Sequence, residues 1–184
     1  MDKMESVLSN FDKHSSGDRM LKAMLSLMQE GIPYGKLTVT AICSRAGLSR
    51  KTFYKFFGST DDLVVFLAQD FVIANHMAED KPGVFHFFNF WYHLQDWLTV
   101  LIDNGLLKRV LELSLNYDDE LLNRREFETP ENSSAVEKKL IFRFAIAGFV
   151  SLLEWWKEQN FHQTPEYMAE LSKSILYGLS EGRE

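Results

Sequence analysis

The chain has 184 residues, of which 46% are hydrophobic and 25% charged, and no low-complexity segment, so it can form one or two domains with a substantial core. Its formal net charge is −6, but residues 1–60 contain nine basic and five acidic residues, while residues 61–184 contain eleven basic and twenty-one acidic ones. The net charge therefore does not exclude nucleic-acid binding, because a basic end on an acidic body attracts phosphates locally.

The beginning of the chain shows no basic-then-apolar signal peptide. The single cysteine, Cys43, excludes an internal disulfide, and its place on an apolar helix face favours a small buried side chain over a nucleophile. Both features are typical of a protein in the reducing cytoplasm, and we expect a cytoplasmic location.

A first helix is expected from Asp18 to Glu30, where Gly31 stops it. Its apolar residues recur at helical spacing and lie on one face: Leu21, Met24, Leu25 and Met28. This pattern predicts packing against a core rather than a ligand site.

Two shorter helices follow, joined by a tight turn. The first runs from about Thr38, its predicted N-cap, to Ala46, and Gly47 ends it because glycine adopts the left-handed conformation without a Cβ clash. Ser49 is placed to cap the second, whose sequence is RKTFYKFF. The spacing predicts that Phe53, Phe56 and Phe57 anchor this helix to the core. Its polar residues then face outward, which suits insertion into the major groove of DNA.

This stretch resembles the helix-turn-helix of the tetracycline-repressor-like (TetR/AcrR) family of bacterial transcription regulators. The matching residues are Thr38, Val39, Ile42, Ala46, Gly47, Leu48, Ser49, Thr52, Phe53, Tyr54, Phe57, Ser59 and Leu63. The sequence departs from the family at Cys43, where a small residue is usual, and at Gly58 and Thr60, where basic residues are usual. The second departure removes an expected phosphate contact.

The predicted DNA-binding residues are Thr38, Ser49, Arg50, Lys51, Thr52, Tyr54 and Lys55. The first turn of the second helix is expected to reach base edges, Tyr54 is carried over from the family as a phosphate ligand, and Lys55 lies close enough to be another. Between positions 36 and 55 there are five cations and no acidic residue, which further favours this role.

A long fourth helix is expected from about Thr60 to Glu79, with Ser59 and Asp62 as a capping box at its start. We place the boundary within this helix, so that residues 1–65 form the DNA-binding domain and residues 66–184 a regulatory and dimerisation domain. The helix would link the two parts mechanically.

Residues 85–104 are the most aromatic stretch and are expected to form one helix. Polar residues interrupt it too often for a membrane span, which needs about 20 apolar residues. His86 and His93 lack further ligands at a telling spacing, so neither a metal nor a cofactor is expected. Aromatic bulk mixed with polar tips is typical of ligand sites, and the predicted pocket consists of Phe88, Trp91, Tyr92, His93 and Trp97, with Arg143 or Trp155 opposite. Plain core packing explains any single one of these residues equally well.

The remaining chain is expected to form helices at 106–115 and 117–126, or one bent helix across both, then two long helices at 135–159 and 165–180. Ser134 and Glu137 form a capping box for the third of these, and Thr164 caps the last. A small-residue stripe predicts a homodimer built as a four-helix bundle. Its predicted interface is Leu140, Phe144, Ala147, Gly148, Ser151, Trp155, Met168, Leu171 and Ile175. Completion of a monomer core is the alternative that periodicity leaves open.

The stretch from Ala145 to Ser172 resembles the C-terminal dimerisation region of a TetR-like subgroup common in Firmicutes, which includes regulators of dihydroxyacetone kinase operons. The two resemblances imply an all-α fold of about nine helices: a three-helix DNA-binding domain, a linking helix and a C-terminal helical domain for ligand binding and dimerisation.

The function that this implies is a DNA-binding transcriptional regulator, a repressor that binds a palindromic operator as a homodimer. Its expected partners are double-stranded DNA, a second copy of the chain, and a small-molecule effector or partner protein at the C-terminal domain. The alternative is a helix-turn-helix protein that acts mainly as a protein–protein interaction module, which the missing cation at Thr60 favours. An enzyme is not expected, because glycine-rich phosphate loops and the H-E-x-x-H and G-x-S-x-G motifs are absent from the sequence.

Overall fold

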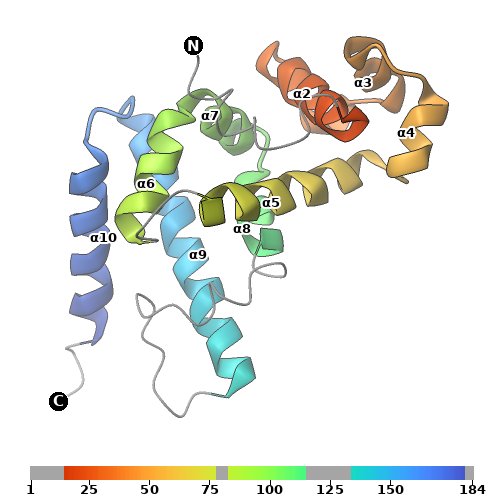
Figure 1. Ribbon diagram of the computed structural model, residues 1–184. Helices are drawn as coiled ribbons and strands as arrows, with labels where there is room; N and C mark the ends of the chain where they lie inside the picture. Colours follow the sequence, from red (N-terminus) through yellow and green to blue (C-terminus); the bar gives the residue numbers. More distant parts are fainter. Residues whose placement is uncertain (1–14, 78–82, 115–133, 181–184) are drawn as a thin grey trace.

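The computed structural model describes residues 15–77, 83–114 and 134–180, with backbone alone at 70–77 and 176–180. These residues form nine α-helices and one 3₁₀ turn, η2, and no strand, as expected. Helices α2 to α4 gather at one end of the molecule, and α5 leads from them to the body formed by α6 to α10 (Figure 1). The helix predicted at 117–126 lies outside the described residues.

The N-terminal group consists of α2 (Ser16–Gln29), η2 (Tyr34–Lys36), α3 (Val39–Ala46) and α4 (Arg50–Phe56). Helix α2 starts two residues earlier than predicted, because the Ser15 hydroxyl oxygen accepts a hydrogen bond from the Asp18 amide. Its apolar face is buried as the periodicity predicts, and α3 and α4 both pack against it.

Helix α5 (Thr60–Met77) begins one residue after Ser59. The Asp62 carboxylate accepts hydrogen bonds from the Gly58 amide (2.7 Å) and from the Ser59 hydroxyl (3.2 Å). The predicted capping box between Ser59 and Asp62 is wrong, because the Ser59 hydroxyl donates to the Asp62 side chain and the Asp62 amide donates to the Ser59 carbonyl. Leu63, Val64 and Ala68 are buried, and α5 packs against α2 at one end and against α8 (Leu107–Ser114) further along. The helix therefore contacts both parts of the molecule, as predicted.

The aromatic stretch forms two helices, so the prediction of a single helix is wrong. Helix α6 (Val84–His93) ends at Leu94, and α7 (Gln95–Asp103) begins directly after it. The break lets α6 pack mainly against α10 while α7 turns toward α2. No glycine or proline lies at the break. We therefore attribute the break to the packing of α6 and α7 against different helices.

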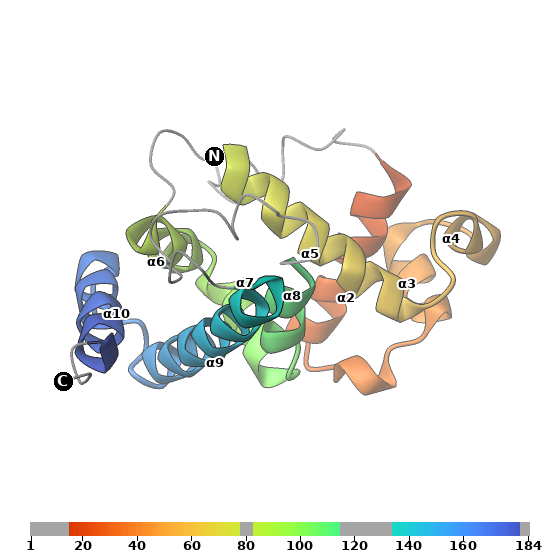
Figure 2. The ribbon, with the colours of Figure 1, turned by 90° about the horizontal axis from the view of Figure 1, so that it is seen from below.

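The last two helices are α9 (Ala135–Glu158) and α10 (Pro165–Ser180). Ser134 and Glu137 form the predicted capping box, with the Ser134 amide donating to Glu137 Oε2 at 2.7 Å. Thr164 caps α10 through the Tyr167 amide. Figure 2 shows α9 and α10 from below, beside α6. Trp156 is fully buried in the core between α6 and α9 and lies against the rings of Phe88 and Tyr92. None of the helices that the structure describes is long and apolar enough to cross a membrane.

Candidate nucleic-acid interface

The turn between α3 and α4 has the geometry that its sequence predicts. The Thr38 hydroxyl oxygen accepts from the Ala41 amide (3.1 Å) and caps α3. Gly47 ends α3 in the left-handed region, with φ of 63°, and the following Leu48 amide donates to the Cys43 carbonyl. Ser49 then caps α4 by accepting from the Thr52 amide (3.0 Å). The two helices thus form a helix-turn-helix unit.

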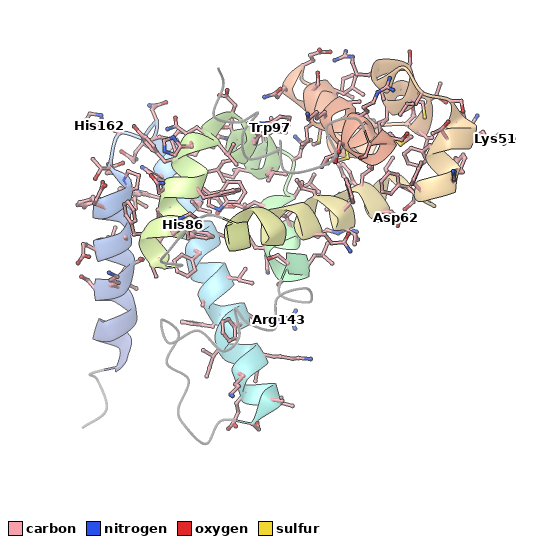
Figure 3. The ribbon with its side chains drawn as sticks, viewed as in Figure 1. Lys51, Asp62, His86, Trp97, Arg143 and His162 are labelled. Carbon is pink, nitrogen blue, oxygen red and sulfur yellow. The ribbon has the colours of Figure 1, made fainter. Side chains whose placement is uncertain are left out.

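Helix α4 is attached to the core by one face only. Phe53 is fully buried and stacks at an angle on Phe57, which in turn contacts Phe66 of α5. Lys51 and Lys55, four residues apart, lie on the opposite side of the helix. In Figure 3 the Lys51 side chain points away from the rest of the molecule.

Phe56 does not anchor α4, and that prediction is wrong: 52% of the residue is exposed. The helix ends at Phe56, and Phe57 leaves it with extended backbone (φ −134°, ψ 135°) and turns inward. Phe57 takes the buried place beside Phe53, so Phe56 stays outside, with the Lys55 ammonium 5.6 Å from its ring centroid. The spacing alone does not distinguish Phe56 from Phe57.

The cations of α4 are free of carboxylates. In the part of the chain that the structure describes, Arg50, Lys51 and Lys55 make no ion pair. The Arg50 guanidinium lies 5.9 Å from the ring centroid of Tyr54, whose own side chain is exposed. This surface therefore presents unneutralised positive charge beside a phenol and the hydroxyls of Ser49 and Thr52.

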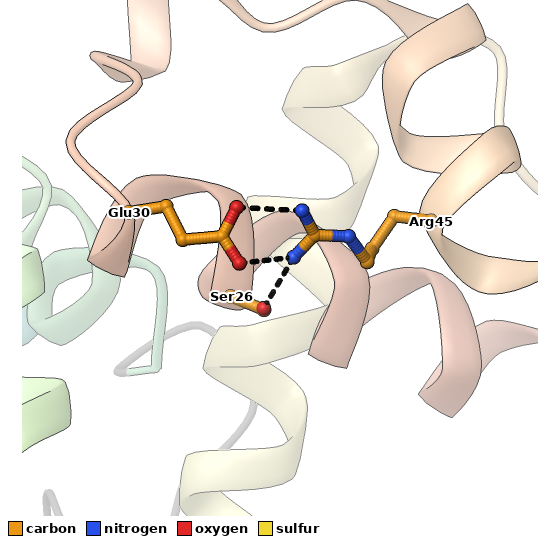
Figure 4. A network of polar contacts seen from close by, with 3 residues as sticks. All are labelled: Ser26, Glu30 and Arg45. Carbon is orange, nitrogen blue, oxygen red and sulfur yellow. Dashed lines mark hydrogen bonds and ion pairs between the residues drawn. The ribbon is translucent and has the colours of Figure 1, made fainter.

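Arg45 is different, although it belongs to the same run of five cations. Its two terminal guanidinium nitrogens donate to the two carboxylate oxygens of Glu30, both at 2.6 Å. One of these nitrogens also donates to the hydroxyl oxygen of Ser26 (Figure 4). These hydrogen bonds from Arg45 hold the pKa of Glu30 below its usual range. Arg45 thus ties α3 to α2, and the number of cations in the run overstates those available to phosphates.

Arg19 is a further residue of this region that sequence patterns do not single out. Its guanidinium donates to the Ala46 carbonyl (2.6 Å) and lies near the Gly47 carbonyl (3.4 Å). These are carbonyls at the end of α3, which the helix itself leaves unpaired. Arg19, on the neighbouring α2, therefore holds the turn between α3 and α4 in place. In the sequence of α2 it looks like an ordinary exposed residue.

Two family models match consecutive parts of the chain. "Bacterial regulatory proteins, tetR family" matches residues 21–65, which contain α3, α4 and the turn between them. "Transcriptional regulator C-terminal region" matches residues 82–178, more than half of the chain. The chain belongs to the TetR family. It is thus a transcriptional regulator with a helix-turn-helix DNA-binding domain, and not an enzyme.

Solved structures agree with this TetR-family fold. A TetR transcriptional regulator from Streptococcus agalactiae 2603V has a TM-score of 0.63 and 20% sequence identity, and the alignment covers 94% of this chain and 96% of that one. The dihydroxyacetone kinase operon activator DhaS has a TM-score of 0.53 and 17% identity, with coverage of 89% and 95%. Identities this low establish the fold alone. A comparison with curated proteins gives no match.

In this TetR-family chain the structure places the seven predicted effector-pocket residues in different surroundings. Phe88 and Trp91 are buried in the core, while Arg143 is exposed on α9 with a guanidinium nitrogen 4.0 Å from Glu112. In Figure 3 Arg143, on α9, lies far from Trp97, which belongs to α7. Tyr92 stacks on the core residue Trp156. His93 and Trp155 are exposed and Trp97 half-buried.

Among the hollows lined by described residues, two lie elsewhere. A cleft of about 520 Å³ separates the end of α2 from α7, and an apolar groove of about 290 Å³ lies between α9 and α10. None of the seven predicted pocket residues lines either of them. Among the described residues, no group of three or more histidine, cysteine or acidic side chains is placed to hold a metal ion.

The predicted dimer residues of α9 form an exposed apolar face. Phe144 is 66% exposed and Leu140 is exposed beside it, and the groove between them and α10 is lined by Gly148, Ser151 and Ile175. The Ser151 hydroxyl donates to the carbonyl of Ala147 one turn earlier. Its hydrogen is therefore already bonded within α9, which leaves this face mainly apolar. Trp155 and Ala147 also lie at the surface, and Leu171 is half-buried.

Met168 is the one predicted interface residue that the structure places elsewhere. Its side chain is fully buried in the protomer core, because α10 packs mainly against α6 and turns this residue inward. Met168 therefore supports the position of α10 and cannot touch a second protomer.

Proposed function

We propose that this TetR-family chain is a repressor that binds a palindromic operator as a homodimer and leaves it when an effector acts on the α6–α10 region. Residues 1–65 would supply the DNA contacts and residues 66–184 the dimer contacts and the regulation. The boundary between them falls inside α5, which packs against both parts.

The observation that carries the DNA-binding part is the unneutralised charge on α4. Arg50, Lys51 and Lys55 make no ion pair in the described structure, whereas nearby Arg45 is held by Glu30. Exposed cations without carboxylate neighbours attract the phosphate backbone and release its counterions on binding. A face of this kind, held on a capped helix, suits the major groove.

The individual roles follow from position. Arg50, Lys51 and Thr52 lie in the first turn of α4, the part of a recognition helix that reaches base edges. Arginine or lysine can bind the O6 and N7 acceptors of guanine, and a threonine methyl can contact thymine. The proposed phosphate ligands are Tyr54, Lys55, Thr38 and Ser49, the last two together with the free amides of the helix starts.

The exposed apolar face of α9 supports the dimer. Phe144 and Leu140 are large, exposed apolar side chains, and their removal from water by a partner would stabilise the dimer. The small residues Ala147, Gly148 and Ser151 allow a second α9 helix to approach closely. A two-fold dimer would place two α4 helices on one side of the DNA, about 34–36 Å apart.

The effector is proposed to act on the α6–α10 region, through the aromatic residues that remain accessible there. Tyr92, His93 and Trp97 retain exposed surface on α6 and α7, whereas Phe88 and Trp91 are too deeply buried to meet a ligand without repacking. A partner protein that docks on the same surface is the alternative kind of signal.

The DNA-binding proposal can be tested with a charge-matched pair of variants. Binding to DNA from upstream of its own gene would be measured for Arg50→Ala/Lys51→Ala/Lys55→Ala and for Lys108→Ala/Lys139→Ala/Lys173→Ala, whose lysines are exposed elsewhere. Both variants lose three positive charges, so the change in net charge is the same. Only the first loses them from α4, and only the first should lose operator binding. Equal losses, or a wild-type protein that ignores all DNA offered, would refute the proposal and favour a protein-interaction module.

The sign of regulation needs a separate measurement. A reporter gene behind the operator should be less expressed when the chain is present, and expression should return when the effector is added. The structural neighbour DhaS is named an operon activator, so increased expression would reverse the sign without affecting the DNA-binding proposal.

A further inference from the structure

The corner between α7 and α8 makes polar contacts at two points that flank the helix-turn-helix unit. The backbone amide of Tyr34, in η2, donates to the side-chain oxygen of Asn104 (2.7 Å). The Tyr34 hydroxyl donates to the carboxylate of Asp61, which also accepts from the guanidinium of Arg109 (3.2 Å). Asn104 is itself oriented by its amide nitrogen, which donates to the Val100 carbonyl (2.9 Å).

These contacts lie where the chain enters and leaves the helix-turn-helix unit. Tyr34 begins the turn that leads directly into the Thr38 cap, and the Leu37 amide closes that turn on the Tyr34 carbonyl (3.0 Å). Asp61 lies in the first turn of α5, which follows α4 after a short connection. Residues of the body therefore hold both ends of the DNA-binding unit.

We propose that Asn104 and Arg109 are positioning residues for DNA binding, which set the angle of the helix-turn-helix unit on the body through Tyr34 and Asp61. The inference rests on the proposed function of the chain as an operator-binding dimer. In such a dimer the angle of each unit decides how far apart the two α4 helices lie, and the distance must match the half-site spacing. Neither residue would touch DNA.

The contacts are suited to orientation more than to stability. The side chains of Arg109 and Asp61 are 43% and 55% exposed, and exposed ion pairs add little to stability. The buried apolar residues of α2, α5 and α8 hold the parts together without them. Hydrogen bonds, however, are directional, and two of them on one residue leave η2 little freedom to rotate.

The charge states that these contacts need persist through the physiological range. The hydrogen bond from Arg109, followed by that from Tyr34, lowers the pKa of Asp61, so its carboxylate stays ionised. Partial burial and the neighbouring Asp61 raise the pKa of Tyr34 to about 12, so its hydroxyl remains a donor. Titration of these groups therefore does not break the contact within this range.

The test uses the full-length protein and an operator that the wild type selects from random-sequence DNA. Affinity would be measured for this operator and for versions with one base pair added to or removed from the space between half-sites. The variants are Arg109→Met and Tyr34→Phe, singly and together. The control is Lys108→Met, which removes the exposed cation next to Arg109 on α8.

We expect the wild type and the control to favour one spacing sharply. In Arg109→Met and in Tyr34→Phe this preference should fall about fivefold or more, with no change in dimerisation and little in thermal stability. The double variant should be no worse than either single one, because both break the same chain of contacts. Arg109→Lys, which keeps one charged donor, should restore part of the preference.

Three results would overturn the inference: a spacing preference that is unchanged in both variants, losses that simply add in the double variant, or losses that follow thermal stability alone. In each of these the wild type still binds its operator, so the proposed function stands. A wild type that selects no operator would reject the proposed function and this inference together.

Discussion

The surface of α4 and the surface of α9 are both exposed, yet they differ in what they present to water. The cations of α4 make no ion pair with any residue that the structure describes, whereas α9 carries large apolar side chains around small ones. Charge acts over a distance of several ångströms and is weakened by salt, while apolar surface acts only on contact and is not. Operator affinity and assembly should therefore depend on different residues and respond to different conditions, and each can be disrupted alone.

The largest expected effect comes from Gly148→Arg on the α9 surface. A Cβ added at Gly148 meets no neighbouring side chain or segment within 4 Å in the protomer, and the residue is exposed, so the variant should fold normally. In a close helix pair, however, it buries an unpaired charge, which is costly. We expect monomers in sedimentation, and operator affinity lower by about 10²–10⁴-fold, because the two half-sites are no longer bound together.

The control for this change is Asp96→Arg on the exposed surface of α7, which should remain dimeric although it changes the charge by even more. A wild-type protein that sediments as a monomer at micromolar concentration would contradict the assignment of the α9 surface. So would a Gly148→Arg variant that remains a dimer.

Arg50→Ala should have the next largest effect and should act on the α4 surface alone. Loss of a base contact is expected to cost about 1–3 kcal/mol and to relax the preference at one base pair of the operator. Affinity for a panel of single-base operator variants would measure both quantities. An unchanged preference at every base pair would assign Arg50 to the backbone or to solvent.

Lys55→Ala should have a smaller effect of another kind. A lost phosphate contact weakens all sequences alike and reduces the slope of log affinity against log salt by about one. Lys139→Ala, which removes an exposed lysine from α9, should leave this slope unchanged. If the two variants behave alike, Lys55 does not contact the phosphate backbone.

Arg45→Ala should have the smallest effect on DNA, because its guanidinium is already bound to Glu30. We expect an unchanged salt slope and a lower melting temperature. The folded-state pKa of Glu30 is depressed, so the pair stabilises the fold above the unfolded carboxylate pKa and ceases to do so as the pH falls below about 4. The difference in melting temperature between wild type and variant should therefore shrink from pH 7 to pH 3, and a changed salt slope would show that Arg45 contacts DNA.

The parts of the fold that local chemistry decides could be predicted from the sequence. Caps and stops are local, so Thr38, Gly47, Ser49 and the capping box at Ser134 lie where their residue types require. The outward-facing side of α4 also follows from periodicity, with one error: Phe56 and Phe57 satisfy the inward spacing equally well, and only the end of the helix decides between them.

What depends on partners distant in the sequence could not be predicted. The break at Leu94 arises because α6 and α7 pack on different helices, and nothing in the local sequence marks it. Arg45 looks like any other cation of its run until Glu30, fifteen residues earlier, is found beside it. Met168 fits the stripe of α10 but faces α6 rather than solvent, because periodicity gives a face and not the neighbour that covers it.

The neighbouring residues Trp155 and Trp156 give the protein two optical reporters with different surroundings. Trp156 is fully buried among aromatic rings, whereas Trp155 is 36% exposed on the α9 surface. Water around an indole shifts its fluorescence to longer wavelength, so Trp155 should emit to the red of Trp156. The difference spectrum between wild type and Trp155→Phe isolates the outer residue. Its emission would follow assembly, while the remaining emission, which Trp91, Trp97 and Trp156 share, would follow the interior of the protomer, so a single cuvette could register the two events separately.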